Sequence, residues 1–215
     1  MGKKKTGSKR SICYAFIDAA NLFYGGKKSL GWSIDYQKLL KYLKNKFGVK
    51  KAFYYAGVET NNFPYDPLFS RPIDLDKLLN FLRKKIKDKS LSEAQVALLG
   101  RHIQRVKFYR KLKKFGYVLR LKPTKIYHEP DRTVKKANCD VDMTFDMMRY
   151  MSQYQEFVFL SGDGDFIVVL KYLKRKGKKI HILARAERTA KEIKRLAGGK
   201  FIDFVRLRTS LEFMK

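Results

Sequence analysis

Short apolar runs that end in acidic residues are the feature that most limits how this chain folds. The run ICYAFI at 12–17 is followed by Asp18, and FVFL at 157–160 leads into SGDGDF at 161–166. Runs this short and this continuously apolar are typical of strands buried on both faces of a sheet. Parallel strands that alternate with helices are covered in this way. The pattern therefore predicts an α/β fold whose strand ends carry carboxylates.

Helical patterns separate the apolar runs along most of the chain. Further strand-like runs lie at 52–58, 117–121, 179–184 and 201–205, and helical spacing occurs at 34–48, 73–87, 92–115, 140–151, 166–177 and 187–197. This alternation predicts a mostly parallel sheet with helices on both faces and right-handed crossovers. The length of 215 residues suits a single domain at 11–215, with a helical insertion at about 60–116 and a disordered basic tail at 1–10.

The charge balance points to a polyanionic partner. The chain has 49 Lys and Arg against 20 Asp and Glu, a formal net charge of +29. Self-repulsion of this size opposes compaction, which favours nucleic acid as a partner and an anionic membrane surface as a second choice. A lysine-rich proteome is the alternative, although such proteomes usually add glutamate as well. With 45% hydrophobic residues, the chain has enough apolar material for a core and is not a disordered polycation.

One stretch concentrates the positive charge. Residues 101–125 contain ten Lys and Arg and no Asp or Glu, with Phe108, Tyr109, Phe115 and Tyr117 interleaved. We expect the aromatic rings in the core, and the cations on a wall of two helices that guides a nucleic-acid strand to the acidic residues. The predicted nucleic-acid-binding residues are Arg101, Arg105, Lys107, Arg110, Lys111, Lys113, Lys114, Arg120, Lys122 and Lys125.

The sequence favours a cytoplasmic protein. No run of 18 apolar residues is present, so no membrane span is expected, and no apolar segment directly follows the basic start as in a secretion signal. The two cysteines, Cys13 and Cys139, form neither a metal-type pair nor a disulfide framework, which fits a reducing compartment.

Carboxylates from three segments are expected to meet at one edge of the sheet. Asp18, Asp163 and Asp165 follow strands, and Asp140 opens the helix that precedes the 157–160 run. Taken singly, each has a structural explanation, since Asp163 suits a helix cap and Asp140 suits a helix N-terminus. Together they predict an oxygen-ligand site for Mg²⁺ or Mn²⁺, a type of site that suits phosphodiester hydrolysis. An EF-hand is excluded because positions 168 and 174 are Val and Lys.

Three segments resemble the signature motifs of NYN domains, which include the LabA-like family within the PIN-like nuclease superfamily. They are FIDAAN at 16–21, KANCDVDMTFD at 136–146 and SGDGDF at 161–166. The resemblance covers roughly residues 11–205 and implies a PIN-like three-layer sandwich with strand order 3-2-1-4-5. It implies a metal-dependent ribonuclease whose metal ligands are Asp18, Asp140, Asp163 and Asp165. The further catalytic positions it implies are Asn21, Asp146 and Ser161; Asp142 has no counterpart in many relatives.

Several functions remain open at this stage. The leading hypothesis is an endoribonuclease that uses Mg²⁺ or Mn²⁺ on single-stranded or structured RNA. The alternatives are a non-catalytic RNA-binding scaffold with the same fold, and a DNA-directed nuclease of the flap or toxin type. A haloacid-dehalogenase-like phosphatase is disfavoured because Ala20 stands where that mechanism needs a second Asp. A homo-oligomer is compatible with all of these hypotheses.

Overall fold

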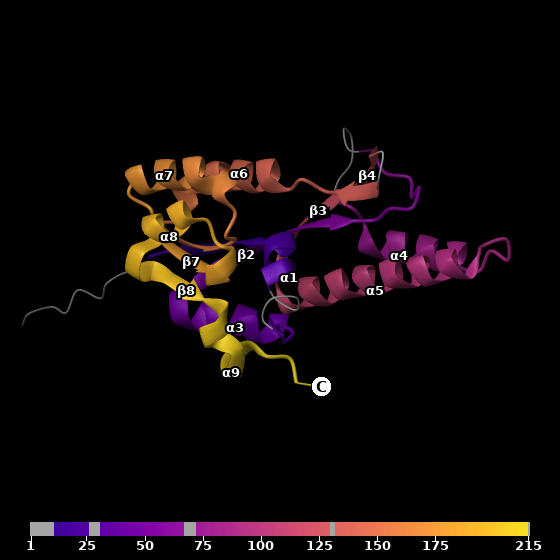
Figure 1. Cartoon of the computed structure of the whole chain (residues 1–215), viewed down its shortest axis with the longest axis horizontal. Coiled ribbons are helices and arrows are strands. Elements are labelled where there is room, and N and C mark those ends of the chain that lie inside the picture. Colours follow the sequence, from indigo (N-terminus) through magenta and orange to yellow (C-terminus); the bar gives the residue numbers. More distant parts are fainter. Residues whose placement is uncertain (1–10, 26–30, 67–71, 130–131, 215) are drawn as a thin grey trace, which may run out of the picture.

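A six-stranded parallel sheet forms the centre of the protein. The computed structural model describes residues 11–25, 31–66, 72–129 and 132–214, so the predicted tail at 1–10 lies outside the described residues. The strands of the central sheet are β1 (Cys13–Asp18), β2 (Val49–Val58), β3 (Val118–Pro123), β6 (Glu156–Leu160), β7 (Lys179–Ala184) and β8 (Phe201–Asp203). All five neighbouring pairs run parallel. Figure 1 shows the sheet edge-on between two layers of helices.

The strand order places β1 at the middle of the sheet. The observed order is β3-β2-β1-β6-β7-β8, which confirms the expected 3-2-1-4-5 order and adds a sixth strand at one edge. β1 pairs with β6 up to Ile17 and Leu160, which are followed directly by Asp18 and by the 161–166 motif. The order reverses between β1 and β6, and at such a point the loops beyond the carboxyl ends of the strands diverge and leave a crevice.

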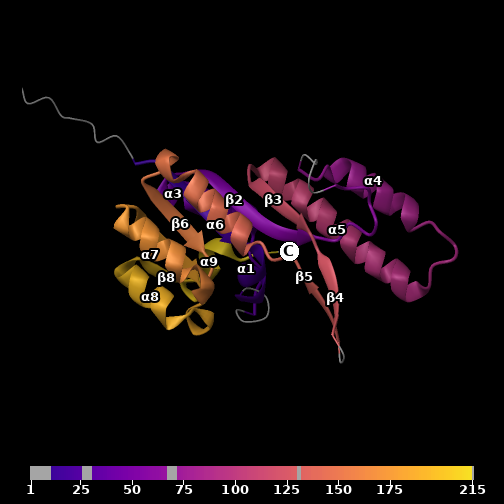
Figure 2. The same ribbon diagram turned by 90° about the horizontal axis from the view of Figure 1, so that it is seen from above.

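Helices cover both faces of the sheet and divide the core in two (Figures 1 and 2). One cluster contains Leu39, Leu79 and Leu112 on one face, and the other contains Met143, Met147 and Leu170 on the opposite face. The first face is covered by α1 (Ala19–Gly25), α3 (Tyr36–Phe47), α4 (Leu75–Lys85), α5 (Glu93–Phe115) and α9 (Arg208–Leu211), and the second by α6 (Asp140–Arg149), α7 (Ile167–Arg175) and α8 (Lys191–Ala197).

The helix ends follow the signals in the sequence. Ser92 caps α5 in a reciprocal capping box with Gln95, as its position predicted. Gly48 and Gly116 end α3 and α5 with φ of 67° and 105°, a left-handed conformation that glycine adopts without a Cβ clash. Four short 3₁₀ segments, at 151–153, 186–188, 198–200 and 204–207, join the remaining elements; a fifth, at 164–166, belongs to the site.

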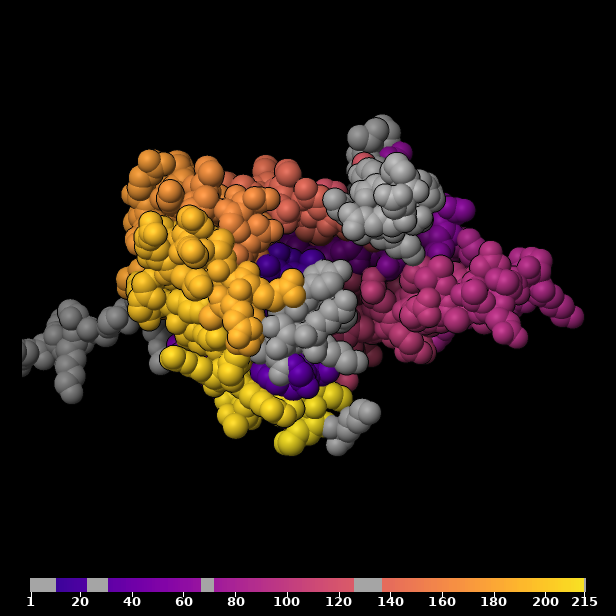
Figure 3. Space-filling view, in the orientation of Figure 1, coloured from indigo at the N-terminus to yellow at the C-terminus, as the bar shows by residue number. Residues whose placement is uncertain are grey.

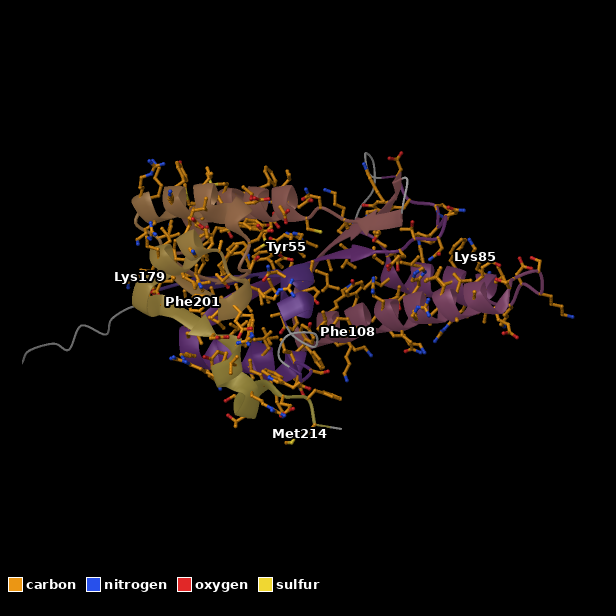
Figure 4. The ribbon with its side chains drawn as sticks, viewed as in Figure 1. Tyr55, Lys85, Phe108, Lys179, Phe201 and Met214 are labelled. Atoms are coloured by element: carbon orange, nitrogen blue, oxygen red, sulfur yellow. The ribbon has the colours of Figure 1, made fainter. Side chains whose placement is uncertain are left out.

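Helices α4 and α5 form an arm that projects past β3 (Figures 1 and 2). They occupy most of the expected insertion, and Figure 4 shows Lys85 towards the outer end of this arm. None of the helices in the described part of the chain is long and apolar enough to cross a membrane.

A two-stranded hairpin, β4 (Lys125–Glu129) and β5 (Arg132–Lys136), was not predicted. The chain leaves the carboxyl end of β3 into β4 and returns from β5 to the start of α6, so the hairpin is rooted at the same edge as Asp140. Its base is fixed against β2, where a Cβ on Gly57 would lie 2.6 Å from the Cβ of Ala137 and 2.9 Å from Oγ1 of Thr124. Gly57 therefore allows the hairpin base to approach the sheet closely.

Candidate active site at the carboxyl ends of the strands

Asp18 lies at the centre of the carboxyl edge and is held by hydrogen bonds on both oxygens. The backbone N–H of Asn21 donates to Oδ1 at 3.1 Å, and the hydroxyl of Ser161 donates to Oδ2 at 3.0 Å. Burial raises the pKa of Asp18; the hydrogen bonds oppose that rise, and the charge of Asp163 adds to it. The carboxylate is thus fixed in orientation, and its charge is only partly compensated.

The loop after β6 brings two more carboxylates to this edge. The N–H of Asp163 donates to Ser161 Oγ at 3.2 Å, and the N–H of Asp165 donates to Oδ1 of Asp163 at 3.0 Å. Asp163 thereby caps the 3₁₀ turn Gly164–Phe166, so the helix-cap explanation also applies to this residue. Phe166 is buried and anchors the turn in the core, while Asp165 is exposed.

Asn21 and Gly162 hold the 161–166 loop against α1 and Thr189. The side-chain oxygen of Asn21 accepts a hydrogen bond from the N–H of Gly162 at 3.0 Å, which ties α1 to the loop. On its other side the loop packs on Thr189, whose Oγ1 and Cα would lie 2.6 Å and 2.9 Å from a Cβ at position 162. Only glycine fits there without a shift of backbone atoms, so these contacts set where Asp163 stands.

Asp140 completes the group from the opposite helix. It begins α6, and its N–H is bound by Oδ1 of Asn138 at 3.0 Å. Desolvation and the charges of Asp18, Asp163 and Asp165 raise the pKa of Asp140 to about 6, with Lys122 acting in the other direction. Like charges gathered at one edge of a sheet raise the pKa of their neighbours in this way. The structure therefore brings together the four residues that the motifs single out.

The four carboxylates have little positive charge around them within the described part of the chain. No ion pair within the described ranges involves any of them. Figure 3 shows the molecule hollowed near its centre, where β1 and α1 (indigo) lie between α6 and α7 above and the segment that begins at residue 31 below. Metal ions in proteins usually bind several acidic, histidine or cysteine side chains at once. Among the described residues, no three such side chains lie close enough to share one metal ion. The edge is thus an open group of oxygen donors and not a closed cage.

Two other acidic residues of α6 lie apart from this group. Asp142 Oδ2 pairs with Lys122 Nζ at 2.7 Å, and buried Asp146 Oδ2 pairs with Arg120 Nε at 2.6 Å. Arg149 binds the second oxygen of Asp146 at 2.6 Å.

Alternate residues of a strand share a face, and residues four apart share a helix face, so these pairs form a ladder between β3 and α6. The hydroxyl of Tyr55 donates to Asp146 at 3.0 Å, and Figure 4 shows Tyr55 between the sheet and this helix. Asp146 is one of the expected catalytic positions. Its described contacts join α6 to β2 and β3, and it does not lie among the four carboxylates.

Some of the expected nucleic-acid-binding cations form ion pairs, and others are exposed to solvent. Arg105 pairs with Glu59 at 2.6 Å and Arg110 with Asp76 at 2.8 Å. Arg101, Lys107, Lys111, Lys113 and Lys114 are exposed on α5, and Lys125 is exposed at the base of the hairpin.

α5 packs on the face of the sheet opposite α6, whereas Arg120 and Lys122 of β3 pair with Asp146 and Asp142 of α6. Sequence reasoning missed this arrangement, since alternation along 118–122 was the only available sign that Arg120 and Lys122 face α6. The aromatic residues behave as expected, with Tyr109 and Tyr117 buried and Phe108 and Phe115 packed against the core.

Comparison with known proteins identifies the family. The NYN domain matches residues 57–208 of the chain. The chain belongs to the NYN domain family. The Low amplitude and bright protein LabA of Synechococcus elongatus is 27% identical over 202 residues, which span 92% of this chain and 86% of LabA. The resemblance drawn from the three motifs is thereby confirmed.

A solved structure shares the fold of this NYN protein. VPA0982 from Vibrio parahaemolyticus, a protein of unknown function, superposes with a TM-score of 0.63 at 17% identity. The superposition covers 96% of this chain and 99% of that one. At this identity the likeness shows a common fold along nearly the whole chain and carries nothing about the site.

Proposed function

We propose that this NYN protein is a metal-dependent ribonuclease that hydrolyses RNA phosphodiester bonds at the carboxyl edge of its sheet. The observation that carries the proposal is the gathering of Asp18, Asp140, Asp163 and Asp165 at one edge of the sheet in a chain of net charge +29. Desolvation and the charges of the other three raise the pKa of Asp140 to about 6. Membership in a nuclease-type family supports the same reading. A gathering of carboxylates that form no ion pair with the described residues is the arrangement that a hard cation stabilises.

The residues fit Mg²⁺ or Mn²⁺ by their chemistry. Each of the four donors is a carboxylate oxygen, the ligand type that both ions prefer. Asp18, Asp140 and Asp163 are the residues that would hold the ion, with Asp165 as the exposed fourth. When bound, the ion would supply charge neutralisation and an activated water for attack on phosphorus.

The remaining residues of the site keep these groups in position. Ser161 and the amide of Asn21 fix the two oxygens of Asp18, and the Asn21 side chain ties α1 to the 161–166 loop. Asp146 anchors α6 through Arg120 and Arg149, so it determines where Asp140 stands without touching the reacting atoms. We therefore assign Asn21, Ser161 and Asp146 as positioning residues.

RNA is the proposed partner because of the distribution of charge. The cations of α5 and of the hairpin base would bind phosphates, while the carboxylate edge repels them until a cation is bound. Neutralising a carboxylate should therefore preserve or tighten RNA binding as it removes cleavage. This behaviour separates the proposed nuclease from a protein that only binds RNA.

The test compares cleavage of an end-labelled RNA, with Mn²⁺ or Mg²⁺ supplied, by wild type and by Asp163→Asn. We expect the variant to lose at least about 100-fold in rate, equivalent to at least about 2.7 kcal/mol of transition-state stabilisation, and to bind RNA as tightly as before. Asp142→Asn is the matched control, since Asp142 pairs with Lys122 outside the group, and its rate should stay within about threefold. Equal cleavage by wild type and Asp163→Asn would refute the site.

One observation favours a second candidate, a non-catalytic RNA-binding scaffold. The described carboxylates do not form a closed group of three, as a preformed metal site would. Tight binding without cleavage across a panel of RNAs, with either metal, would establish this candidate. The same panel run with single-stranded DNA of matched sequence tests the DNA-directed alternative.

A further inference from the structure

An exposed apolar stripe runs along α6, away from the carboxylates. Val141, Phe145 and Arg149 lie four residues apart and so occupy one face of the helix. Val141 is 71% exposed and Phe145 is 58% exposed, unusually high for apolar residues of a helix that packs on the core. The stripe begins one residue after Asp140, so it borders the proposed reaction site.

A fixed guanidinium lies beside the Phe145 ring. The Cζ of Arg149 lies over the Phe145 ring, 5.2 Å from its centroid, and over the Tyr150 ring, 4.6 Å from its centroid. Its NH2 donates to Oδ1 of Asp146 at 2.6 Å and to the hydroxyl of Tyr150 at 2.8 Å, which limits its movement. A planar cation held over an exposed aromatic ring makes a ready platform for a flat, electron-rich ring, because little freedom remains to be lost on binding.

We propose that Phe145 and Arg149 form a subsite for an unpaired base of the RNA strand. This inference rests on the proposed function and narrows its substrate to RNA that is single-stranded next to the cleaved bond. A base inside a duplex hides its face against its neighbours, so only an unpaired base can stack on the ring. Phe145 lies five residues from Asp140, about 7–8 Å along the helix axis, or roughly two nucleotides of a stacked strand at about 3.4 Å each.

The charges around the stripe suit a phosphate backbone. The ladder that flanks it contains Lys122, Arg120 and Arg149 against Asp142 and Asp146, a balance of three cations to two carboxylates. Both carboxylates are paired, so they do not repel a strand that passes over them. An apolar partner helix fits less well, because it would have to bury the guanidinium of Arg149.

The experiment measures RNA binding in the Asp163→Asn chain, where the substrate stays intact. Phe145→Ala, Phe145→Tyr and Phe213→Ala are each introduced into this chain. The binding of each variant to a fluorescein-labelled single-stranded RNA, and to a blunt duplex of the same sequence, is measured by fluorescence anisotropy. Phe213 is the matched control, since it is 49% exposed and lies near the C-terminus, away from α6.

We expect Phe145→Ala to weaken binding of the single strand by about 5- to 100-fold and of the duplex by less than about twofold. Phe145→Tyr keeps the ring and should bind like the parent, as should Phe213→Ala. Unchanged melting temperatures would show that each variant folds, as expected for exposed side chains.

Three outcomes overturn the inference. If Phe145→Ala binds the single strand as tightly as its parent, the subsite does not exist, while cleavage by the chain with Asp163 intact still supports the nuclease. If single strand and duplex weaken equally, the stripe binds the backbone or another partner and not a base. If the parent does not bind RNA and the chain with Asp163 intact does not cleave it, the proposed function fails and the subsite fails with it.

Discussion

Neutralising Asp140 should stabilise the protein when no divalent cation is present. The pKa of Asp140 rises from 3.8 to about 6, chiefly through desolvation and through three neighbouring carboxylates. A shift of this size corresponds to roughly 3 kcal/mol of unfavourable free energy once the group is fully ionised. Asp140 is partly exposed and stands at the N-terminus of α6, so solvent screening and the helix dipole reduce the expected net gain to about 1 kcal/mol.

The pH dependence fixes the sign of this effect. The unfolded chain releases the Asp140 proton near pH 3.8 and the folded chain near pH 6, so between these values the folded chain binds more protons. The stability of the wild type therefore falls as the pH rises through this window, and the whole penalty is present above about pH 6. Asp140→Asn lacks the charge and escapes the penalty.

Thermal unfolding without divalent cations is the assay. At about pH 7.5 we expect Asp140→Asn to melt about 2–4 °C above wild type, the shift that about 1 kcal/mol produces in a domain of this size. At about pH 4.5 the difference should shrink, because the wild-type carboxyl is then protonated. Added Mn²⁺ should raise the melting temperature of wild type more than that of the variant.

A matched variant on the same helix separates this effect from a general change in charge. Asp142→Asn removes the carboxylate that pairs with Lys122 at 2.7 Å, so its stability should fall by about 0–1 kcal/mol or stay level. Two results would refute the reasoning: an Asp140→Asn chain that melts below wild type at about pH 7.5, or a difference that is the same at both pH values. Either would mean that the four carboxylates do not act on one another.

Three further outcomes are expected. Asp146→Asn should lower the free energy of unfolding by about 2 kcal/mol in denaturant titrations. Asp146 is only 3% exposed, and without its charge Arg120 and Arg149 lose a buried partner. Gly162→Ala should reduce cleavage at least about tenfold, with RNA binding kept, because its Cβ would displace Thr189 or the loop. RNA affinity measured across a salt series should fall with a log–log slope of about −4 if six phosphates are contacted, and a slope near zero would exclude the phosphate-binding surface.

The alternation of strands and helices and the gathering of acidic residues were accessible from the sequence because both follow from local patterns, whereas the order of the strands came from the resemblance to NYN domains. Continuous apolar runs marked β1 and β6, and the parallel arrangement brought the motifs that follow them to one edge. Caps at Ser92, Gly48 and Gly116 were readable because they depend on one or two neighbouring residues.

The features that were missed depend on contacts between distant segments. The hairpin at 125–136 has few apolar residues and is fixed by the approach of its base to Gly57, which no local pattern reveals. The pairing of Asp146 with Arg120 joins residues 26 positions apart, and the sequence alone made both look functional for separate reasons. Charge along a sequence shows how many cations exist but not which carboxylates they will neutralise.

That distinction sharpens the argument for the site. The chain has more than twice as many cations as carboxylates, so an acidic side chain placed without constraint would usually meet a partner. Asp142 and Asp146 do so, on the same helix that Asp140 begins. Asp140 instead has three carboxylates as its strongest charged neighbours, and the nearest opposing cation, Lys122, is already paired. In so basic a protein this local deficit of positive charge among the described residues is what the proposed metal site accounts for, and a purely structural role for Asp140 does not account for it.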